Sequence, residues 1–143
     1  MQQKLSASNP GPGRRLIIVR PAAEVAIKSR RTRQKFEKML RGNVTQALAS
    51  VGATCDLRQD FGRLYLSTES ADAALGVLPK VFGIGTFSVV DAACAPTMEA
   101  IVEQGTKSFA DQIQGRTYAV RAKKIAPLGF STQEVNERLG AAL

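Results

Sequence analysis

The sequence contains no histidine and no tryptophan, and only two cysteines occur among its 143 residues. Histidine is the side chain that most often serves as a general base and as a metal ligand. Its absence excludes a Ser-His-Asp triad, a Cys-His pair and any zinc site that contains histidine. Gly83 and Gly85 are not followed by the lysine of a Walker A loop, so they are expected to serve a turn. We therefore expect no catalytic residue, no metal site and no cofactor in this chain.

Long apolar runs are also missing. The longest aliphatic run, residues 16–19, is far too short to span a bilayer, and the polar residues 1–13 lack the apolar segment of a signal peptide. We therefore predict a cytoplasmic protein without a membrane partner, and a flexible tail over residues 1–13. Cys55 and Cys94 are 39 positions apart and form no Cys-x-x-Cys motif, and we interpret them as two small buried hydrophobic side chains.

Positive charge is concentrated in one stretch of the chain. Residues 14–41 contain ten of the 20 basic residues and two of the 12 acidic ones, whereas residues 42–143 contain nine basic and ten acidic residues. The formal net charge of +8 therefore belongs almost entirely to an N-terminal element. A local excess of this size points to a polyanionic partner, either nucleic acid or an acidic membrane surface.

The expected elements of residues 14–93 predict an α+β fold. Their order is β-α-β-β-α-β, which is that of a ferredoxin-like domain with an antiparallel sheet and both helices on one face. Gly52 is expected to end the first helix, and Thr68 or Ser70 to cap the second. The expected elements are a strand over 15–21, a helix over about 29–51, strands over 53–59 and 63–67 joined by a turn at 60–62, a second helix, and a strand over 86–90.

Residues 94–143 are expected to form a second, incomplete α/β unit. An amphipathic helix lies between Pro96 and Gly115, a strand is expected over 116–125, and the capping-box sequence at 131–134 begins a last helix. One strand cannot cover both helices, so the unit is interpreted as part of a domain. The predicted organisation is a tail over 1–13, a ferredoxin-like domain over 14–93 and a partial domain over 94–143.

The helix after the first strand carries the strongest functional signal. Arg31, Lys35 and Lys38 recur at helical spacing on one exposed stripe. Lys28 and Ser29 lie at the start of the helix, where free N–H groups and the positive end of the helix dipole favour an anion. A phosphate backbone would find a cluster of donors there. The alternative is a solvated helix face whose aliphatic stems cover the edge of the core.

A second basic group lies in the last fifty residues. The expected strand places Arg121 and Lys123 on the same side, next to Lys124. RNA contact and a sheet edge protected by charge are both open readings of this group. Tyr118 and Phe130 are expected in the core, and no aromatic pattern for stacking RNA bases is present. Recognition through phosphates and shape is therefore favoured over base stacking.

Several motifs follow one another in a specific order, namely residues 25–29, then Arg33, Phe36 and Leu40, then residues 42–44, and residues 81–84. Taken together, they resemble the start of the ThiI-type tRNA sulfurtransferases, the 4-thiouridine synthases that are also linked to thiamine biosynthesis. Residues 116–124 with Phe130 resemble the beginning of a THUMP domain, so the resemblance implies a ferredoxin-like domain followed by part of a THUMP domain. The likeness extends over about residues 15–143.

The resemblance implies that both modules bind tRNA. The family's chemistry lies in an ATP-using domain with a Ser-Gly-Gly-x-Asp-Ser loop, which these residues do not contain, so a separate or missing catalytic domain is an implied partner. THUMP would hold the acceptor end of the tRNA. The implied RNA contacts are Lys28, Ser29, Arg33, Arg121, Lys123 and Lys124.

Two alternatives remain open. The chain is a non-catalytic remnant or oligomerisation module whose C-terminal unit pairs with another chain, through apolar residues such as Phe109, Ile113 and Leu139. The implied partner is then a second copy of this chain, in a homo-oligomer. The third reading is a stand-alone enzyme.

Overall fold

A computed structural model describes residues 11–143 of the chain. The chain divides after Val90 into two compact units, which are treated separately below. Most of the predicted tail lies outside the described residues. Its last residues form a turn, in which the Arg14 N–H donates to the Gly11 carbonyl at 3.3 Å.

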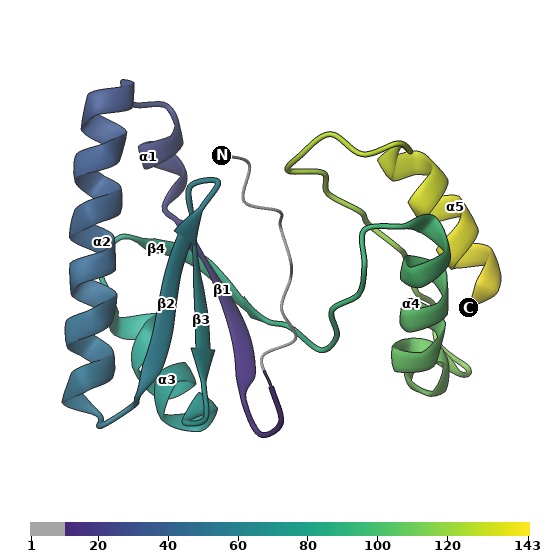
Figure 1. The fold of residues 1–143 in the computed structure, drawn as a ribbon, viewed down its shortest axis with the longest axis horizontal. Coiled ribbons are helices and arrows are strands. Elements are labelled where there is room, and N and C mark those ends of the chain that lie inside the picture. The colour runs from purple at the N-terminus through teal and green to yellow at the C-terminus, as the bar shows by residue number, and fades with distance from the viewer. Residues whose placement is uncertain (1–10) are drawn as a thin grey trace. The chain divides into compact units, whose positions relative to one another are not determined.

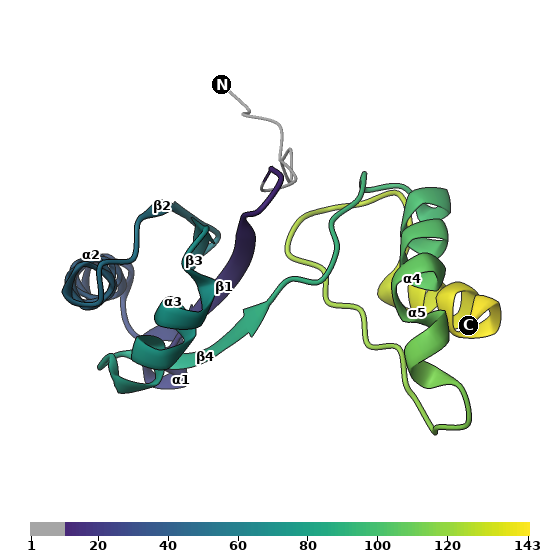
Figure 2. The same cartoon turned by 90° about the horizontal axis from the view of Figure 1, so that it is seen from below.

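The first unit contains a four-stranded antiparallel sheet with the spatial order β2-β3-β1-β4 (Figure 1). Helices α2 and α3 lie on the same face of this sheet (Figure 2). This arrangement confirms the ferredoxin-like α+β fold. The elements are β1 (Arg15–Pro21), α1 (Ala23–Ala26), α2 (Arg30–Ser50), β2 (Cys55–Asp60), β3 (Arg63–Thr68), α3 (Ala71–Val77), the 3-10 helix η1 (Leu78–Lys80) and β4 (Ile84–Val89).

Local signals at both ends of α2 explain its bounds. The Ser29 hydroxyl caps the helix by accepting from the Thr32 N–H at 3.4 Å. At the other end Gly52 adopts a φ of 67°, which confirms its predicted role. Its N–H donates to Ala49 and that of Ala53 to Leu48, both at 3.0 Å, so the last carbonyls of the helix are satisfied.

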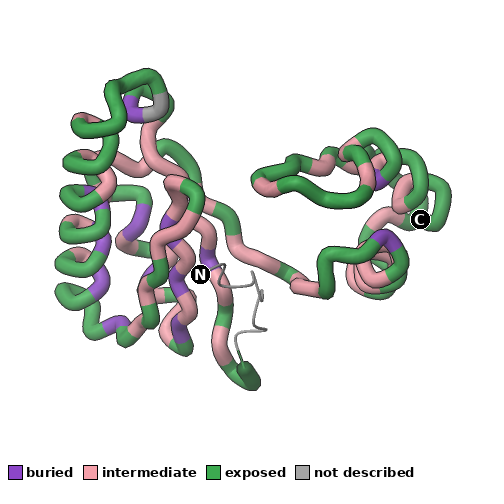
Figure 3. The backbone as a smooth tube through the Cα atoms, turned by 45° about the horizontal axis from the view of Figure 1, so that its top comes forward, coloured by how far each residue is buried: buried purple, intermediate pink, exposed green. Residues whose placement is uncertain are grey.

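The core lies between the sheet and these helices. Alternate residues of β1 and β3 are buried, and an i, i+4, i+8 stripe of α2 covers them (Figure 3). The alternation leaves the other set of strand side chains, including Ile18 and Tyr65, on the open face of the sheet. The buried side chains that form this core include Ile17, Val19, Leu40, Val44, Leu48, Leu64, Leu66 and Leu78.

One polar side chain is wholly buried in this core. The Thr68 hydroxyl donates to the Thr54 carbonyl at 2.8 Å and accepts from the Ser70 N–H at 2.9 Å. Ser70 occupies the N-cap position of α3, but its own side chain makes no capping hydrogen bond. Thr68 therefore links β3, the chain before β2 and the start of α3.

Replacing this hydroxyl by a methyl group tests the link. Thr68→Val keeps the shape of the side chain and leaves the buried partners unsatisfied, so we expect it to lower the free energy of unfolding by about 2 kcal/mol. Urea denaturation measures the change. The control is Thr86→Val on the exposed surface of β4, for which we expect no loss. Equal effects of the two variants would contradict the assigned role.

The second unit consists mainly of two helices, α4 (Met98–Ile113) and α5 (Thr132–Ala142), which pack against each other. Ser131 and Glu134 form the predicted capping box at the start of α5. The helices approach closely at Gly105, where a Cβ atom would lie 2.6 Å from Leu139 Cδ1. Phe109, Ile113 and Leu139, which motivate the oligomer alternative, are half-buried rather than exposed.

The predicted strand over residues 116–125 is wrong. This stretch is irregular, and no strand lies in the described part of the second unit to pair with it. A strand needs a neighbour that accepts and donates its backbone hydrogen bonds. Here α5 takes that role instead: Asn136 Oδ1 accepts from the Ala122 N–H at 2.7 Å, and the Tyr118 hydroxyl donates to the Gly140 carbonyl at 2.9 Å.

Candidate nucleic-acid interface

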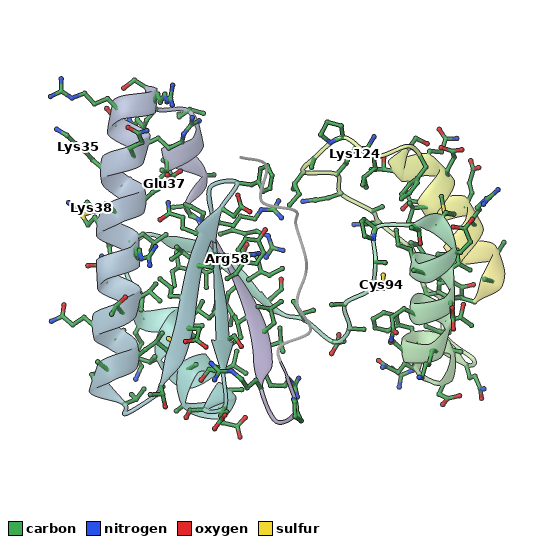
Figure 4. All side chains as sticks on the ribbon, viewed as in Figure 1. Lys35, Glu37, Lys38, Arg58, Cys94 and Lys124 are labelled. Atoms are coloured by element: carbon green, nitrogen blue, oxygen red, sulfur yellow. The ribbon has the colours of Figure 1, made fainter. Side chains whose placement is uncertain are left out.

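The structure separates the predicted basic residues of α2 onto two sides of the helix. Arg31, Lys35 and Lys38 are exposed and lie opposite the buried stripe that begins at Leu40. Lys35 and Lys38 point away from the sheet (Figure 4). We call Arg31, Lys35 and Lys38 the outer stripe.

Arg33 lies on the inner side of the helix instead. Its Nε atom is 4.0 Å from Glu37 Oε1, and the Glu37 carboxylate also accepts from Gln59 Nε2 at 3.1 Å. Arg30, which the sequence analysis did not single out, shares this side with Arg33. Residues 30, 33 and 37 are spaced by three and four positions, which places them on one side of a helix. This spacing was the sequence signal that Arg30 and Arg33 do not belong to the outer stripe.

Lys28 and Ser29 occupy the turn before α2, and both are exposed. The Ser29 hydroxyl is already engaged by Thr32, whose Oγ1 atom lies 3.0 Å away. No acidic residue lies in the first turn of the helix. The Thr32 N–H is capped by the Ser29 hydroxyl, and the Arg33 N–H donates to the Ser29 carbonyl at 2.8 Å. The N–H groups of Arg30 and Arg31 have no partner within the helix and favour an anion.

No carboxylate of the described residues lies within 4.0 Å of a cation of the outer stripe. Among the described residues, ion pairs within 4.0 Å join Arg14 to Asp56 and Glu69, and Arg33 to Glu37. The positive charge of the outer stripe is therefore available to a partner. Such exposed, uncompensated cations on a rigid helix are suited to phosphate groups.

The second basic group lies in the second unit, in the irregular stretch before α5. Arg121, Lys123 and Lys124 are all exposed, but they do not share one side of a strand as the sequence analysis expected. Hydrogen bonds from Ser131 lower the pKa of Glu134, and the nearby Arg138 and Lys124 lower it further.

The open face of the sheet holds polar residues that the sequence analysis missed. The guanidinium carbon of Arg58 lies 5.1 Å from the centroid of the Tyr65 ring, and Arg20 Nη1 donates to Ser88 Oγ at 2.9 Å. The period-two alternation of β3, in which Leu64 and Leu66 alternate with Arg63 and Tyr65, was the signal for this face. Tyr118, expected in the core, is 43% exposed. Phe130 is half-buried.

Neither cysteine is fully buried, contrary to the expectation. Both thiols are free and half-buried. Burial raises the pKa of both, and for Cys55 the neighbouring Asp56 raises it further while Arg14 opposes the shift. A raised pKa keeps a thiol protonated and weakens it as a nucleophile.

None of the helices within the described residues, 11–143, is long and apolar enough to cross a bilayer. No group of three or more cysteine, aspartate and glutamate side chains gathers there in a way that could hold a metal ion.

Comparison with protein families identifies the first unit. The model of the ThiI ferredoxin-like domain matches residues 16–88, which run from β1 to β4 and include α2 with its outer stripe. The chain belongs to the ThiI ferredoxin-like domain family. The resemblance seen in the sequence motifs of the first unit is thereby confirmed.

Curated relatives of this ThiI-family chain are tRNA sulfurtransferases. A probable tRNA sulfurtransferase of Saccharolobus solfataricus is 34% identical over 128 residues, which are 90% of this chain and 33% of the relative. A tRNA sulfurtransferase of Aeromonas hydrophila is 33% identical over 129 residues, covering 88% of this chain and 27% of the relative. The chain thus spans about a third of the length of such relatives.

Solved structures extend the likeness of fold into the second unit. The protein PH1313 of Pyrococcus horikoshii has a TM-score of 0.71 and 27% identity, over 90% of this chain and 43% of its own. A 4-thiouridine synthetase in a complex with RNA and bound ATP has a TM-score of 0.64 and 24% identity, over 90% of this chain and 32% of its own. Coverage of 90% exceeds the first unit alone and therefore includes residues beyond Val90.

Proposed function

We propose that this ThiI-family chain binds tRNA and is the tRNA-recognition part of a sulfurtransferase that forms 4-thiouridine. The names of the curated relatives and the RNA in the solved synthetase complex support this proposal. In the proposal the chain works in the cytoplasm and positions tRNA for a catalytic domain outside these 143 residues. That domain uses ATP, and the sulfurtransferase also takes part in thiamine biosynthesis.

The outer stripe is the observation that carries the proposal. It presents three uncompensated cations along about 10 Å of one rigid helix, since residues 31 and 38 are seven rises of 1.5 Å apart. Long basic side chains on such a frame can each contact a phosphate and release its counterions. Lys28, beside the first turn of α2, adds a fourth exposed cation at the end of the stripe.

The second unit is proposed to act as the THUMP portion. Its irregular basic segment is held against α5 by the hydrogen bond from the Ala122 N–H to Asn136. This contact fixes the backbone between the exposed Arg121 and Lys123, which limits the entropy lost when they contact a phosphate. The tether thus replaces the strand that the sequence analysis expected as the support of this group.

Neutralising the outer stripe tests the proposal. We expect the triple variant Arg31→Gln, Lys35→Gln, Lys38→Gln to bind unmodified tRNA about 10- to 100-fold more weakly at about 0.1 M salt, because three counterion-releasing contacts are lost. Filter binding or fluorescence anisotropy of labelled tRNA measures the dissociation constant. Circular dichroism confirms that the exposed substitutions leave the fold intact.

A matched triple variant separates the location of charge from its amount. Lys80, Lys107 and Arg116 are exposed cations outside both basic groups, and changing all three to glutamine removes the same net charge. We expect this control to retain most of the affinity. A similar loss in both triple variants would show that tRNA responds to net charge alone and would contradict the assigned interface.

A further inference from the structure

A cleft of about 480 Å³ opens at one end of the ferredoxin-like unit. It lies between the first turns of α2, the end of β1 with α1, and the tip of the β2–β3 hairpin. Its volume falls within the range of small-ligand pockets. The residues that matter to the argument are Pro21, Val25, Arg30, Arg33, Glu37 and Phe61.

The cleft exists because α2 begins well before the core. The helix starts at Arg30, but its first buried residue is Leu40, so ten residues, or about 15 Å of helix, precede the first fully buried contact. The inner side of this extension lines the cleft and meets the sheet at Glu37, which accepts from Gln59 Nε2 of β2. The length of α2 is thus explained by the cleft rather than by the core.

The charged groups of the cleft are two guanidinium groups and one carboxylate. Glu37 is only 18% exposed and is held by Gln59 Nε2 at 3.1 Å, with Arg33 Nε at 4.0 Å. The remaining N–H groups of Arg33 have no carboxylate within 4.0 Å among the described residues, and Arg30 has none at all there. The cleft therefore offers donors for an anion next to a fixed hydrogen-bond acceptor.

Phe61 supplies an aromatic ring at the mouth of the cleft. It occupies the first central position of the two-residue turn between β2 and β3, with a φ of 47°, and Gly62 follows with a φ of 69°. Both values are those of a type I′ turn, which favours asparagine or glycine at the position of Phe61. The ring is half exposed, so core packing does not explain a phenylalanine in this strained conformation.

We propose that this cleft binds one unpaired nucleotide of RNA. The base stacks on the Phe61 ring, its phosphate accepts hydrogen bonds from Arg30 and Arg33, and the Glu37 carboxylate accepts from an amino or imino N–H at the edge of the base. The outer stripe, in contrast, contacts phosphates alone. The inference rests on the proposed RNA binding and adds base stacking, which the sequence analysis did not expect.

Single-stranded and duplex RNA distinguish the two kinds of contact. The probes are a single strand of about eight nucleotides, within the site sizes of single-strand binders, and the blunt duplex that it forms with its complement. We expect Phe61→Leu in the full chain to weaken binding of the single strand by about 5- to 100-fold, as for the loss of one stacked base. Binding of the duplex is expected to stay unchanged. The matched control is Phe82→Leu, because Phe82 is 78% exposed and lies outside the cleft.

A second variant separates binding from folding. Phe61→Gly removes the ring and relieves the left-handed strain, so its unfolding midpoint is expected to rise while its affinity for the single strand falls. Equal affinities of Phe61→Leu, Phe61→Gly and Phe82→Leu for the single strand would overturn the inference and leave RNA binding through the outer stripe intact. Failure of the unaltered chain to bind either RNA at low salt would overturn both this inference and the proposed function.

Discussion

Raising the salt concentration from about 50 to 200 mM is expected to weaken tRNA binding by three to four orders of magnitude. Each phosphate contact releases about 0.9 counterions, so the logarithm of the affinity falls linearly with the logarithm of the salt concentration. Seven exposed cations carry the proposed interface, and they predict a slope of about −6. They are Lys28, Arg31, Lys35, Lys38, Arg121, Lys123 and Lys124.

The slope also shows whether one or both of the basic groups contact the same tRNA. Lys28 and the outer stripe alone predict a slope between about −3 and −4 and a loss of about 100-fold over the same salt range. The triple glutamine variant of the outer stripe is expected to reduce the slope of the unaltered chain by about three. Fluorescence anisotropy titrations at four or five salt concentrations measure these values. A slope close to zero would contradict phosphate contacts as the basis of binding.

The ferredoxin-like unit was largely predictable because its local signals agree with its tertiary packing. Arg15 and Pro21 are the bounds of β1 in both the prediction and the structure. Ser29 and Gly52 mark the ends of α2 through a side-chain cap and a left-handed residue, which depend on a few neighbouring residues alone. Such features can be found in a sequence without knowledge of distant contacts.

The strand over residues 116–125 was mispredicted because alternation of side chains does not reveal the backbone's partner. Tyr118 and Ala122 do contact a neighbour, but that neighbour is helix α5, through the carbonyl of Gly140 and the side chain of Asn136. An amphipathic extended segment against a helix and a strand in a sheet give the same pattern in one sequence. Only the long-range contacts separate them.

The positive charge of the candidate site was predictable from the sequence, but the separation of its basic residues into the outer stripe and the cleft was not. The excess of basic residues on α2 follows from counting, and the outer stripe follows from helical spacing. The inner position of Arg33 depends on where the helix leaves the core, and the nearness of Phe61 depends on the register of the β2–β3 hairpin. The cleft is therefore a consequence of tertiary structure that composition and periodicity do not contain.

The second large effect is expected from Gly85→Ala, which should lower the free energy of unfolding by about 3 kcal/mol. Gly85 was expected to serve a turn, but it lies inside β4, where β1 has an irregular register. A Cβ atom there would lie 2.7 Å from the Pro21 carbonyl oxygen and 3.0 Å from the Ala22 Cα atom. The contact is with backbone, so no side-chain rotation can relieve it.

The surroundings of Gly85 prevent the backbone from moving aside. Strand β1 is paired on both sides, and the Ala22 N–H donates to the Gly83 carbonyl at 2.9 Å, which fixes β1 next to β4. Gly76→Ala in α3 is the matched control: a Cβ atom there meets nothing within 4 Å, and alanine is favoured over glycine in a helix by up to about 1 kcal/mol. Urea denaturation should therefore show a lower free energy of unfolding for Gly85→Ala and a higher one for Gly76→Ala. An unchanged free energy of unfolding in Gly85→Ala would show that the irregular pairing of β1 and β4 can shift at little cost. The end of β1 would then not be a rigid wall of the cleft.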